Sequence, residues 1–156
     1  DERVYWLTML REAKYKDINH LCDFLSPFHE EGAYGDISVS KNTAVKNLTS
    51  MLSSPMHKIW IVERDGEICG ALGVVSTELW FSKRHYATNL FLCTNTMGKG
   101  SAGFLLRAFK RWVNERPIIK DVTLAITSEI GDVERVEKLY QAVGFKRLGG
   151  LFRYIQ

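Results

Sequence analysis

The sequence predicts an α+β fold in which helices pack on a mostly antiparallel sheet. In the middle of the chain, apolar residues alternate with polar ones over Lys58–Arg64, and an apolar strand pattern follows over Ile68–Ser76. On either side of this region, apolar residues recur with the spacing of helices. No repeat, low-complexity tract or linker interrupts the 156 residues, a length typical of one domain. We therefore expect residues 1–156 to form a single α+β domain.

The first part of the chain predicts a strand, a helix and a loop. The apolar and aromatic run Val4–Leu10 is typical of a strand. Apolar residues then recur at helical spacing over residues 15–28, and Pro27 is expected to end this helix because proline has no amide proton to donate. The polar stretch 29–36 contains two glycines and is predicted to be a loop.

A second helix and a hairpin follow. Ser40 is a suitable N-cap for a helix over residues 41–52, because its hydroxyl oxygen accepts a hydrogen bond from a first-turn amide. The two central strands are separated by Asp65-Gly66. This dipeptide between two strand patterns is the strongest short-range signal of a hairpin.

The next part combines a strand, a glycine-rich turn and an amphipathic helix. The strand is predicted over Tyr86–Thr94 and the helix over Phe104–Val113, with residues 95–103 between them. A short buried strand is expected over Val122–Ile126.

The end of the chain predicts one more helix and a closing hairpin. The helix spans Val133–Val143, and Gly144 occupies the position after it where a left-handed residue ends many helices. Residues 145–148 and 151–155 are expected to pair as strands around Gly149-Gly150.

Composition excludes several classes of protein. The 46% apolar and 25% charged fractions are those of a folded protein, and a net charge of +3 is too small to indicate nucleic acid as the partner. No apolar run approaches the roughly 18 residues of a membrane span, so no membrane association is expected. The three cysteines are widely spaced, which favours reduced thiols and a cytoplasmic location, and the four histidines lack metal-ligand spacing.

The glycine-rich turn suits a bound diphosphate. Glycines at a helix N-terminus let an anion approach unpaired backbone amides, where the helix dipole is positive. Neither G-x-x-x-x-G-K-[ST] nor G-x-G-x-x-G with a later ribose-binding acid is present. Spacing alone leaves open that Gly98 and Gly100 only make a tight turn.

Two further segments give the chain a recognisable resemblance. Leu139-Tyr140-Gln141-Ala142-Val143-Gly144-Phe145 ends the last helix, and Phe104-Leu105-Leu106-Arg107-Ala108-Phe109 opens the one after the turn. With the turn, they resemble the GCN5-related N-acetyltransferase (GNAT) superfamily, in particular its compact phage-type members. The resemblance implies a mixed, mostly antiparallel sheet of about six to seven strands flanked by about four helices.

The resemblance also implies a chemistry, the direct attack of an amine on the thioester of acetyl-CoA. The superfamily's diphosphate motif, Arg/Gln-x-x-Gly-x-Gly/Ala, matches Met97–Ala102 except at Met97, and Val133 stands where many members carry Asn. Tyr140 matches the tyrosine that protonates the leaving thiolate. The implied CoA-binding residues come from the strand end and the turn: Leu92, Cys93, Thr94, Met97, Gly98, Lys99, Gly100, Ser101, Ala102 and Gly103. No metal is implied.

The base that accepts the amine proton has several candidates. Glu30 and Glu31 are preferred because they lie in the predicted loop where the superfamily places part of its acceptor site. Glu78, His85 and a water molecule remain alternatives. Cys93 is expected to be a packed thiol and not a nucleophile, since no activating base is near it in sequence.

The implied partners are few. The acceptor is an amine on a small molecule or a protein, and the resemblance is also compatible with a homodimer. The expected location is the cytoplasm, which is that of the host if the chain is phage-encoded. Lys99, Arg107 and Lys138 are candidates for the 3′-phosphate of CoA, and Trp80-Phe81 for the acceptor side. The alternative reading is an inactive GNAT-like protein that binds CoA or serves as a structural interaction module. Acceptor, base and oligomeric state are left open by the sequence.

Overall fold

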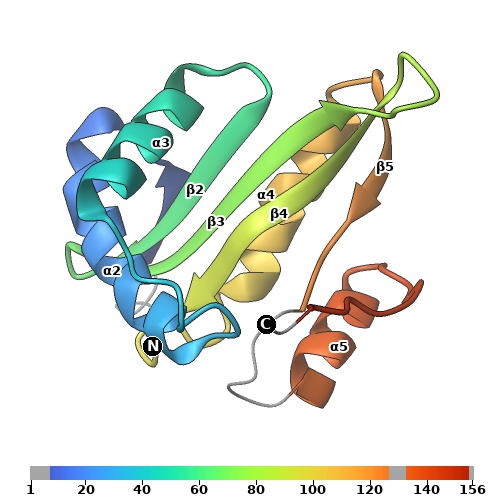
Figure 1. The fold of residues 1–156 in the computed structure, drawn as a ribbon. Helices are drawn as coiled ribbons and strands as arrows, with labels where there is room; N and C mark the ends of the chain where they lie inside the picture. The colour runs from blue at the N-terminus through green and yellow to red at the C-terminus, as the bar shows by residue number, and fades with distance from the viewer. Residues whose placement is uncertain (1–7, 127–132, 155–156) are drawn as a thin grey trace.

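A five-stranded sheet runs through the centre of the computed structural model, which describes residues 8–126 and 133–154 (Figure 1). Its strands lie in the order β1-β2-β3-β4-β5, which is also their order along the chain. The strands are β1 (Thr8–Glu12), β2 (His57–Arg64), β3 (Glu67–Glu78), β4 (His85–Thr94) and β5 (Ile119–Thr123). The helices are the 3-10 turn η1 (Tyr15–Asp17), α2 (Ile18–Glu31), α3 (Lys41–Ser53), α4 (Ala102–Asn114) and α5 (Val133–Ala142).

The sheet is antiparallel except at one edge. β1, β2, β3 and β4 pair antiparallel in succession, and β5 pairs parallel to β4. The α4 helix makes the crossover between these parallel strands, as a parallel connection requires. The mixed, mostly antiparallel sheet is thus confirmed, with five strands in the described residues where about six to seven were expected.

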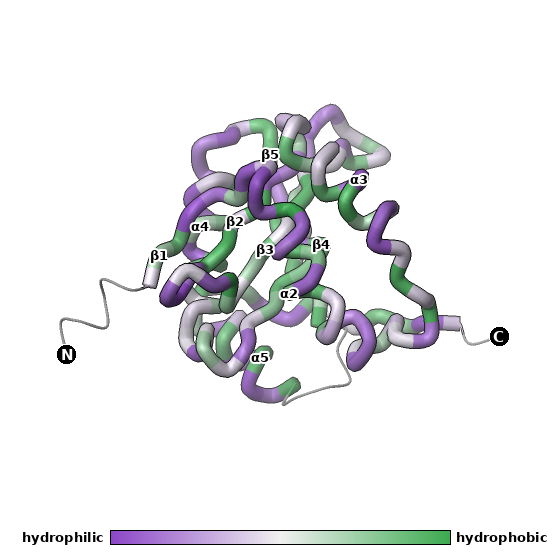
Figure 2. The backbone as a smooth tube through the Cα atoms, turned by 90° about the vertical axis from the view of Figure 1, so that its left-hand side faces the viewer, coloured by the Kyte–Doolittle hydropathy of each residue, from purple (hydrophilic) through white to green (hydrophobic). Residues whose placement is uncertain are grey.

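Alternation along β2 divides the core into two layers. Ile59 and Ile61 pack against α2 and α3 on one face of the sheet, whereas Trp60 and Val62 pack against α4 on the other. Figure 1 shows these helices on opposite sides of the sheet, and Figure 2 shows apolar residues concentrated along the central strands. Successive side chains of a strand point to opposite faces of the sheet. A central strand with a helix layer on each face therefore needs apolar residues at consecutive positions, as β2 has.

Two local predictions are confirmed in detail. The Ser40 hydroxyl accepts a hydrogen bond from the Thr43 amide at the start of α3. Asp65 and Gly66 both have positive φ, 53° and 79°, which is the type I′ turn expected between β2 and β3.

The helix predicted over residues 15–28 begins with η1 and does not end at Pro27. The α2 helix continues to Glu31, with Pro27 inside it. Proline removes one hydrogen bond but fixes φ near the helical value. Phe24 and Phe28, with ring centroids 5.2 Å apart, pack one turn apart across it. The predicted loop therefore starts at Gly32, because His29–Glu31 belong to the last helical turn.

Three strand predictions need correction. The described part of the first strand is Thr8–Glu12, since residues 4–7 lie outside the described residues. The fifth strand is shifted toward the N-terminus of the predicted run, because pairing with β4 starts at Ile119 and stops at Thr123. The closing hairpin is absent, as residues 145–154 form no strand. Gly144 nevertheless ends α5 as predicted, with φ of 99° and the Phe145 amide donating to the Tyr140 carbonyl.

Candidate active site

The two halves of β4 have different neighbours. His85–Thr88 pair with both β3 and β5, whereas Asn89–Thr94 pair with β3 alone. Figure 1 shows β5 diverging from β4 along this second half. Since alternate backbone groups of a strand point to opposite neighbours, some amides and carbonyls of Asn89–Thr94 have no strand to bond.

A bulge coincides with the divergence. The register between β3 and β4 shifts between Gly73 and Val74, so that Gly73 faces Phe91 and Val74 faces Asn89, leaving Leu90 as the extra residue. A side chain at position 73 would clash, because a Cβ there would lie 2.4 Å from the Phe91 ring. Bulges of this kind commonly end pairing beside active sites. Sequence analysis missed it, although Gly73 inside a strand was the available signal.

Asn89 bridges the two diverging strands. Its side-chain oxygen accepts a hydrogen bond of 2.9 Å from the Ala125 amide, just past the end of β5. This contact replaces a strand hydrogen bond and holds the segment 124–126 at a side chain's distance from β4. Asn89 is a further site residue that sequence reasoning did not find.

The divergence leaves a cavity of about 600 Å³, which we call the β4 cavity. One wall is Asn89–Thr94, and the opposite walls come from the end of α2, the loop after it and α5. The walls are largely apolar. The polar side chains among the lining residues are those of His29, Glu31, Tyr34, Asn89, Cys93, Thr94 and Tyr140.

Tyr140 lies where α5 meets this cavity. Its side chain is only 8% exposed, and its hydroxyl donates a hydrogen bond of 3.2 Å to the Ala125 carbonyl. Burial raises the pKa of this hydroxyl to about 12, and the nearby Cys93 thiol adds to the shift. Tyr140 is therefore protonated at neutral pH, with its one hydroxyl proton directed to the Ala125 carbonyl. The predicted neighbours, Tyr140 and residues 92–94, are thus brought together.

Cys93 lines the same cavity as a neutral thiol. Burial raises its pKa to about 11, and no positively charged group offsets the shift. A nucleophilic cysteine needs a lowered pKa. The direction of this shift supports the interpretation of Cys93 as a packed thiol.

The glycine-rich turn is fixed tightly against β3. A Cβ on Gly98 would lie 2.1 Å from the Cys69 carbonyl oxygen, so only glycine fits there. The Asn95 amide donates to that same carbonyl, and the Ser101 hydroxyl donates to the Gly98 carbonyl over 2.6 Å. Gly100 has φ of 88°, with open space where a side chain would be.

Several amides of this turn are unpaired. Within the described residues, the backbone amides of Gly100, Ala102, Gly103 and Phe104 have no hydrogen-bond acceptor. They lie at the N-terminus of α4, where the helix dipole is positive. Arg64, at the end of β2, donates to the Met97 carbonyl over 3.2 Å and adds positive charge beside the turn. The turn can thus accept an anion on its backbone even though Met97 carries no charge.

The two predicted bases differ in position. Both lie in the last turn of α2 and are exposed, but only Glu31 is among the residues that line the β4 cavity. His29, two residues before it, also lines the cavity, and its Nε2 lies 2.6 Å from the Ile37 carbonyl oxygen. The structure thus brings Glu31 to the candidate site and leaves Glu30 outside its lining.

Other sequence candidates lie at the opposite end of the sheet. Trp80 and Phe81 form the exposed tip between β3 and β4, with Trp80 94% exposed, and they do not line the β4 cavity. Glu78 and His85 flank the same tip, and His85 hydrogen-bonds Ser76. The tip is separated from Thr94 by the whole length of β4, about 30 Å at 3.3 Å per residue.

The segment after α5 reaches back to the loop beside the cavity. Arg153 donates to the Ala33 carbonyl and to both carboxylate oxygens of Asp36, at 3.1 and 2.9 Å, and lies over the Tyr34 ring. The guanidinium holds the pKa of Asp36 below its usual value. These contacts direct residues 145–154 toward the α2–α3 loop and help explain why they do not add strands to the sheet.

The described residues contain neither a membrane-spanning helix nor a cluster of metal-ligating side chains. None of their helices has the apolar length to cross a bilayer, and no three His, Cys, Asp or Glu side chains among them converge as metal ligands would.

The solved structures with a matching fold include acetyltransferases. Glucosamine-6-phosphate N-acetyltransferase from Arabidopsis thaliana superposes with a TM-score of 0.74 at 13% identity, over 96% of this chain and 99% of that one. The aminoglycoside acetyltransferase AAC(6′)-Iy, in complex with the bisubstrate analogue CoA-S-monomethyl-acetylneamine, gives 0.72 at 15% identity over 96% and 97%. AAC(6′)-Ih from Acinetobacter baumannii gives 0.68 at 10% identity over 96% and 97%.

These similarities are visible in structure and not in sequence. No protein-family profile matches the chain, and no curated protein sequence matches it. At 10–15% identity the three superpositions establish the fold, over nearly the whole length of each chain. The chain therefore has the GCN5-related N-acetyltransferase fold that its turn and its last helix resemble.

Proposed function

We propose that the protein is an acetyl-CoA-dependent N-acetyltransferase that moves an acetyl group to an amine. The observation that carries the proposal is the half of β4, Asn89–Thr94, that pairs with β3 alone. It lies between a helix N-terminus with free amides and a buried, protonated tyrosine. This arrangement provides an anion site at the end of the strand, a slot for an extended arm beside it and a proton donor on α5 that lines the same cavity.

The turn after β4 would hold the diphosphate of CoA. Four unpaired amides, at Gly100 and Ala102–Phe104, point to a ligand with several acceptor oxygens. Gly100 leaves open space above the turn, and Gly98 lets the turn lie close to β3. The turn would fit the diphosphate through its main-chain amides. Met97, which replaces the Arg or Gln of the superfamily motif, does not remove these donors.

The backbone groups of Leu92–Thr94 that point away from β3 would bind the arm and the reacting carbonyl. In an antiparallel strand, amides that do not face β3 face the cavity side. Fixed amide donors at the place where negative charge develops are among the largest contributions to catalysis. Acetyl-CoA supplies the activated acetyl group as a thioester.

Tyr140 would protonate the departing thiolate. Its pKa of about 12 keeps the hydroxyl neutral over the whole physiological range, as a proton donor requires. The Ala125 carbonyl, which accepts its hydrogen bond, orients the hydroxyl within the cavity.

Glu31 is the preferred proton acceptor. An amine of pKa about 10.4 is charged at pH 7, and removing its proton costs about 4.6 kcal/mol. Glu31 lines the β4 cavity and can attract the cationic amine and take its proton directly or through water. Glu30 does not line the cavity, so we assign it no part in the chemistry.

The acceptor would be a small molecule carrying one amine. The β4 cavity, of about 600 Å³, has the volume of a small-molecule site. The neighbours named above act on glucosamine-6-phosphate and on aminoglycosides, both of which are amino sugars. Walls formed by Phe28, Leu90 and Phe91 suit a less polar body.

A second function is supported by a specific departure. Met97 and Val133 stand where the superfamily has polar residues, which would suit a protein that binds CoA without turnover. Calorimetric titration with acetyl-CoA, followed by a thiol-release assay over a panel of amines, distinguishes the two. We expect binding and release of one thiol per amine acetylated. Binding without release for any amine would favour the inactive protein, and no binding would overturn both proposals.

A further inference from the structure

A second cavity, of about 340 Å³, lies at the end of the sheet away from the glycine-rich turn. Its lining comes from the connection between α3 and β2, from β2 and β3, and from the segment after α4. Ser76 pairs with Ala87 near the start of β4, whereas the candidate active site lies at the other end of that strand. None of the functions proposed above uses this cavity.

Arg116 gives the cavity a cation without an acidic partner. Its guanidinium lies 4.5 Å from the Trp112 ring centroid, and Nη1 donates to the Trp112 carbonyl over 3.0 Å. Among the described residues, no carboxylate lies within ion-pair distance of it. The stacking and the carbonyl fix the guanidinium and leave its remaining N–H groups to donate elsewhere.

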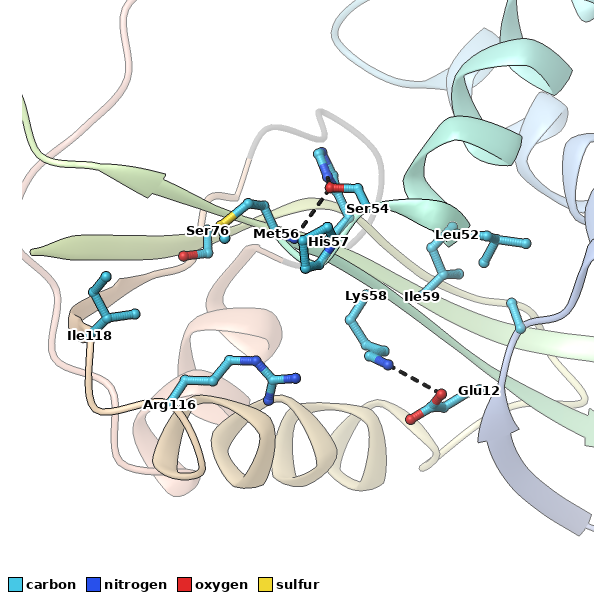
Figure 3. Close-up of a pocket in the computed structure, with 12 residues that line it drawn as sticks. Glu12, Leu52, Ser54, Met56, His57, Lys58, Ile59, Ser76, Arg116 and Ile118 are labelled. Atoms are coloured by element: carbon cyan, nitrogen blue, oxygen red, sulfur yellow. Dashed lines mark hydrogen bonds and ion pairs between the residues drawn. The ribbon is translucent and has the colours of Figure 1, made fainter.

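Lys58 supplies a second cation from the sheet. Its ammonium pairs with Glu12 over 3.2 Å, and the Glu12 side chain is 64% exposed against 25% for that of Lys58. Exposed pairs of this kind contribute little, so a bound anion can replace Glu12 at small cost. Figure 3 shows Arg116, from the segment after α4, and Lys58, from β2, extending into the same space, with the pair to Glu12 dashed.

The remaining lining combines hydroxyls with apolar side chains. Ser76 is 5% exposed and lines the cavity, and its Oγ lies 2.9 Å from His85 Nδ1. Leu52, Met56 and Ile118 form apolar walls. A guanidinium can bind a carboxylate or phosphate through two N–H groups, and the walls would cover an attached hydrocarbon.

We propose that this cavity is a binding site for a small organic anion, one carboxylate or phosphate group on a short apolar body. Its position at the far end of β4 means that the anion and CoA would bind without competing. The proposal does not depend on the acetyltransferase activity, because it rests on Arg116, Lys58 and Ser76 alone.

The test uses the full chain with hexanoate, phenyl phosphate and hexanol as probes. Calorimetry and amide NMR shifts should show that at least one of the two anions binds, with shifts at Lys58, Ser76 and Ile118. Hexanol, which has the same body as hexanoate and no charge, should bind at least about tenfold more weakly than the anion. Binding should persist with saturating CoA. Shifts confined to residues 89–104, equal binding of hexanol, or no binding of either anion would overturn the proposal.

Variants separate a binding role for Arg116 from a purely structural one. Arg116→Ala should weaken anion binding about tenfold to a hundredfold, the effect of one lost charged hydrogen-bond pair. Arg111→Ala removes an exposed cation from the preceding helix, α4, and should change nothing. If Arg116→Ala does not fold, Lys58→Gln takes its place and should weaken binding at least about threefold. Unchanged affinity in the folded variant would contradict the proposal.

Discussion

The two halves of β4 illustrate how one strand can serve both stability and function. His85–Thr88 bond to a strand on each side, whereas Asn89–Thr94 bond to β3 alone and line a cavity. The first half joins β5 to the sheet. The second half leaves backbone groups free, and a bulge at Leu90 marks the change.

Under the proposed function, the site would be made mostly from main chain. The free groups of Asn89–Thr94 and the unpaired amides of the α4 N-terminus would do the binding, and few side chains are needed for it. Such a site tolerates wide sequence change. That agrees with superpositions over 96% of the chain at 10–15% identity.

The largest effect is expected from a change that moves the turn away from the open half of β4. In Gly98→Ala, the new methyl group would lie 2.1 Å from the Cys69 carbonyl oxygen, so one of the two backbones must shift. We expect a loss of about 3 kcal/mol in the free energy of unfolding and at least about tenfold weaker CoA binding. Chemical denaturation and calorimetry would measure them.

Gly149→Ala is the matched control, because no atom lies within 4 Å of the position of its new methyl group. This variant should leave both the free energy of unfolding and the CoA affinity unchanged. Full stability and CoA affinity in Gly98→Ala would show that the turn is not held against β3 as described.

Removing the proton donor that faces the open half should come next. Tyr140→Phe keeps the ring packed against Phe145 and removes the hydroxyl. We expect turnover to fall about 10–100-fold with CoA affinity nearly unchanged. Because the pKa of Tyr140 is about 12, the hydroxyl stays protonated below that pH, and the limbs of the pH–rate profile below about pH 10 should keep their positions in the variant. Wild-type turnover in Tyr140→Phe would end the assignment.

A smaller effect is expected from the acidic pair at the end of α2. Glu31→Gln should lower turnover about tenfold and weaken the acidic limb of the pH–rate profile, whereas Glu30→Gln should do neither. Steady-state kinetics of both variants across pH would measure these effects. The two variants are matched, because the residues are adjacent and the same conservative substitution is made at each. If Glu31→Gln and Glu30→Gln both keep wild-type turnover and the same acidic limb, water would be the proton acceptor.

The smallest effect is expected at Cys93, inside the open half itself. Its pKa of about 11 keeps the thiol neutral, so Cys93→Ala should retain turnover within about threefold. Mass spectrometry after mixing wild-type protein with acetyl-CoA should find no acetyl group on this residue. A large loss of turnover together with a trapped acetyl-thioester would indicate a covalent route in place of direct attack.

Local patterns in the sequence predict most of the fold. The Ser40 cap, the Asp65-Gly66 turn and the Gly144 helix end depend on neighbours along the chain, and the structure contains all three. The position of β5 and the course of residues 145–154 depend on partners far away in sequence. Pairing with His85 sets the start of β5, and Arg153 contacts residues 33–36 across the molecule.

The candidate site divides in the same way. Tyr140, residues 92–94 and residues 97–103 could be named because they lie in continuous motifs, and the structure places Tyr140 and residues 92–94 around one cavity. Asn89 and the bulge at Leu90 could not, because each acts through a long-range contact that no local pattern encodes. Glu31 could be separated from Glu30 only once the course of α2 past Pro27 was known.

Amide NMR of the full chain during titration with CoA tests the central claim most directly. If the open half of β4 and the turn form the CoA site, the largest shifts will fall on Leu92–Thr94 and on Gly100 and Ala102–Phe104. The amides of His85–Thr88, which are held between two strands, will barely move. Saturable binding with its largest shifts at His85–Thr88, or no shift at the turn, would contradict the account.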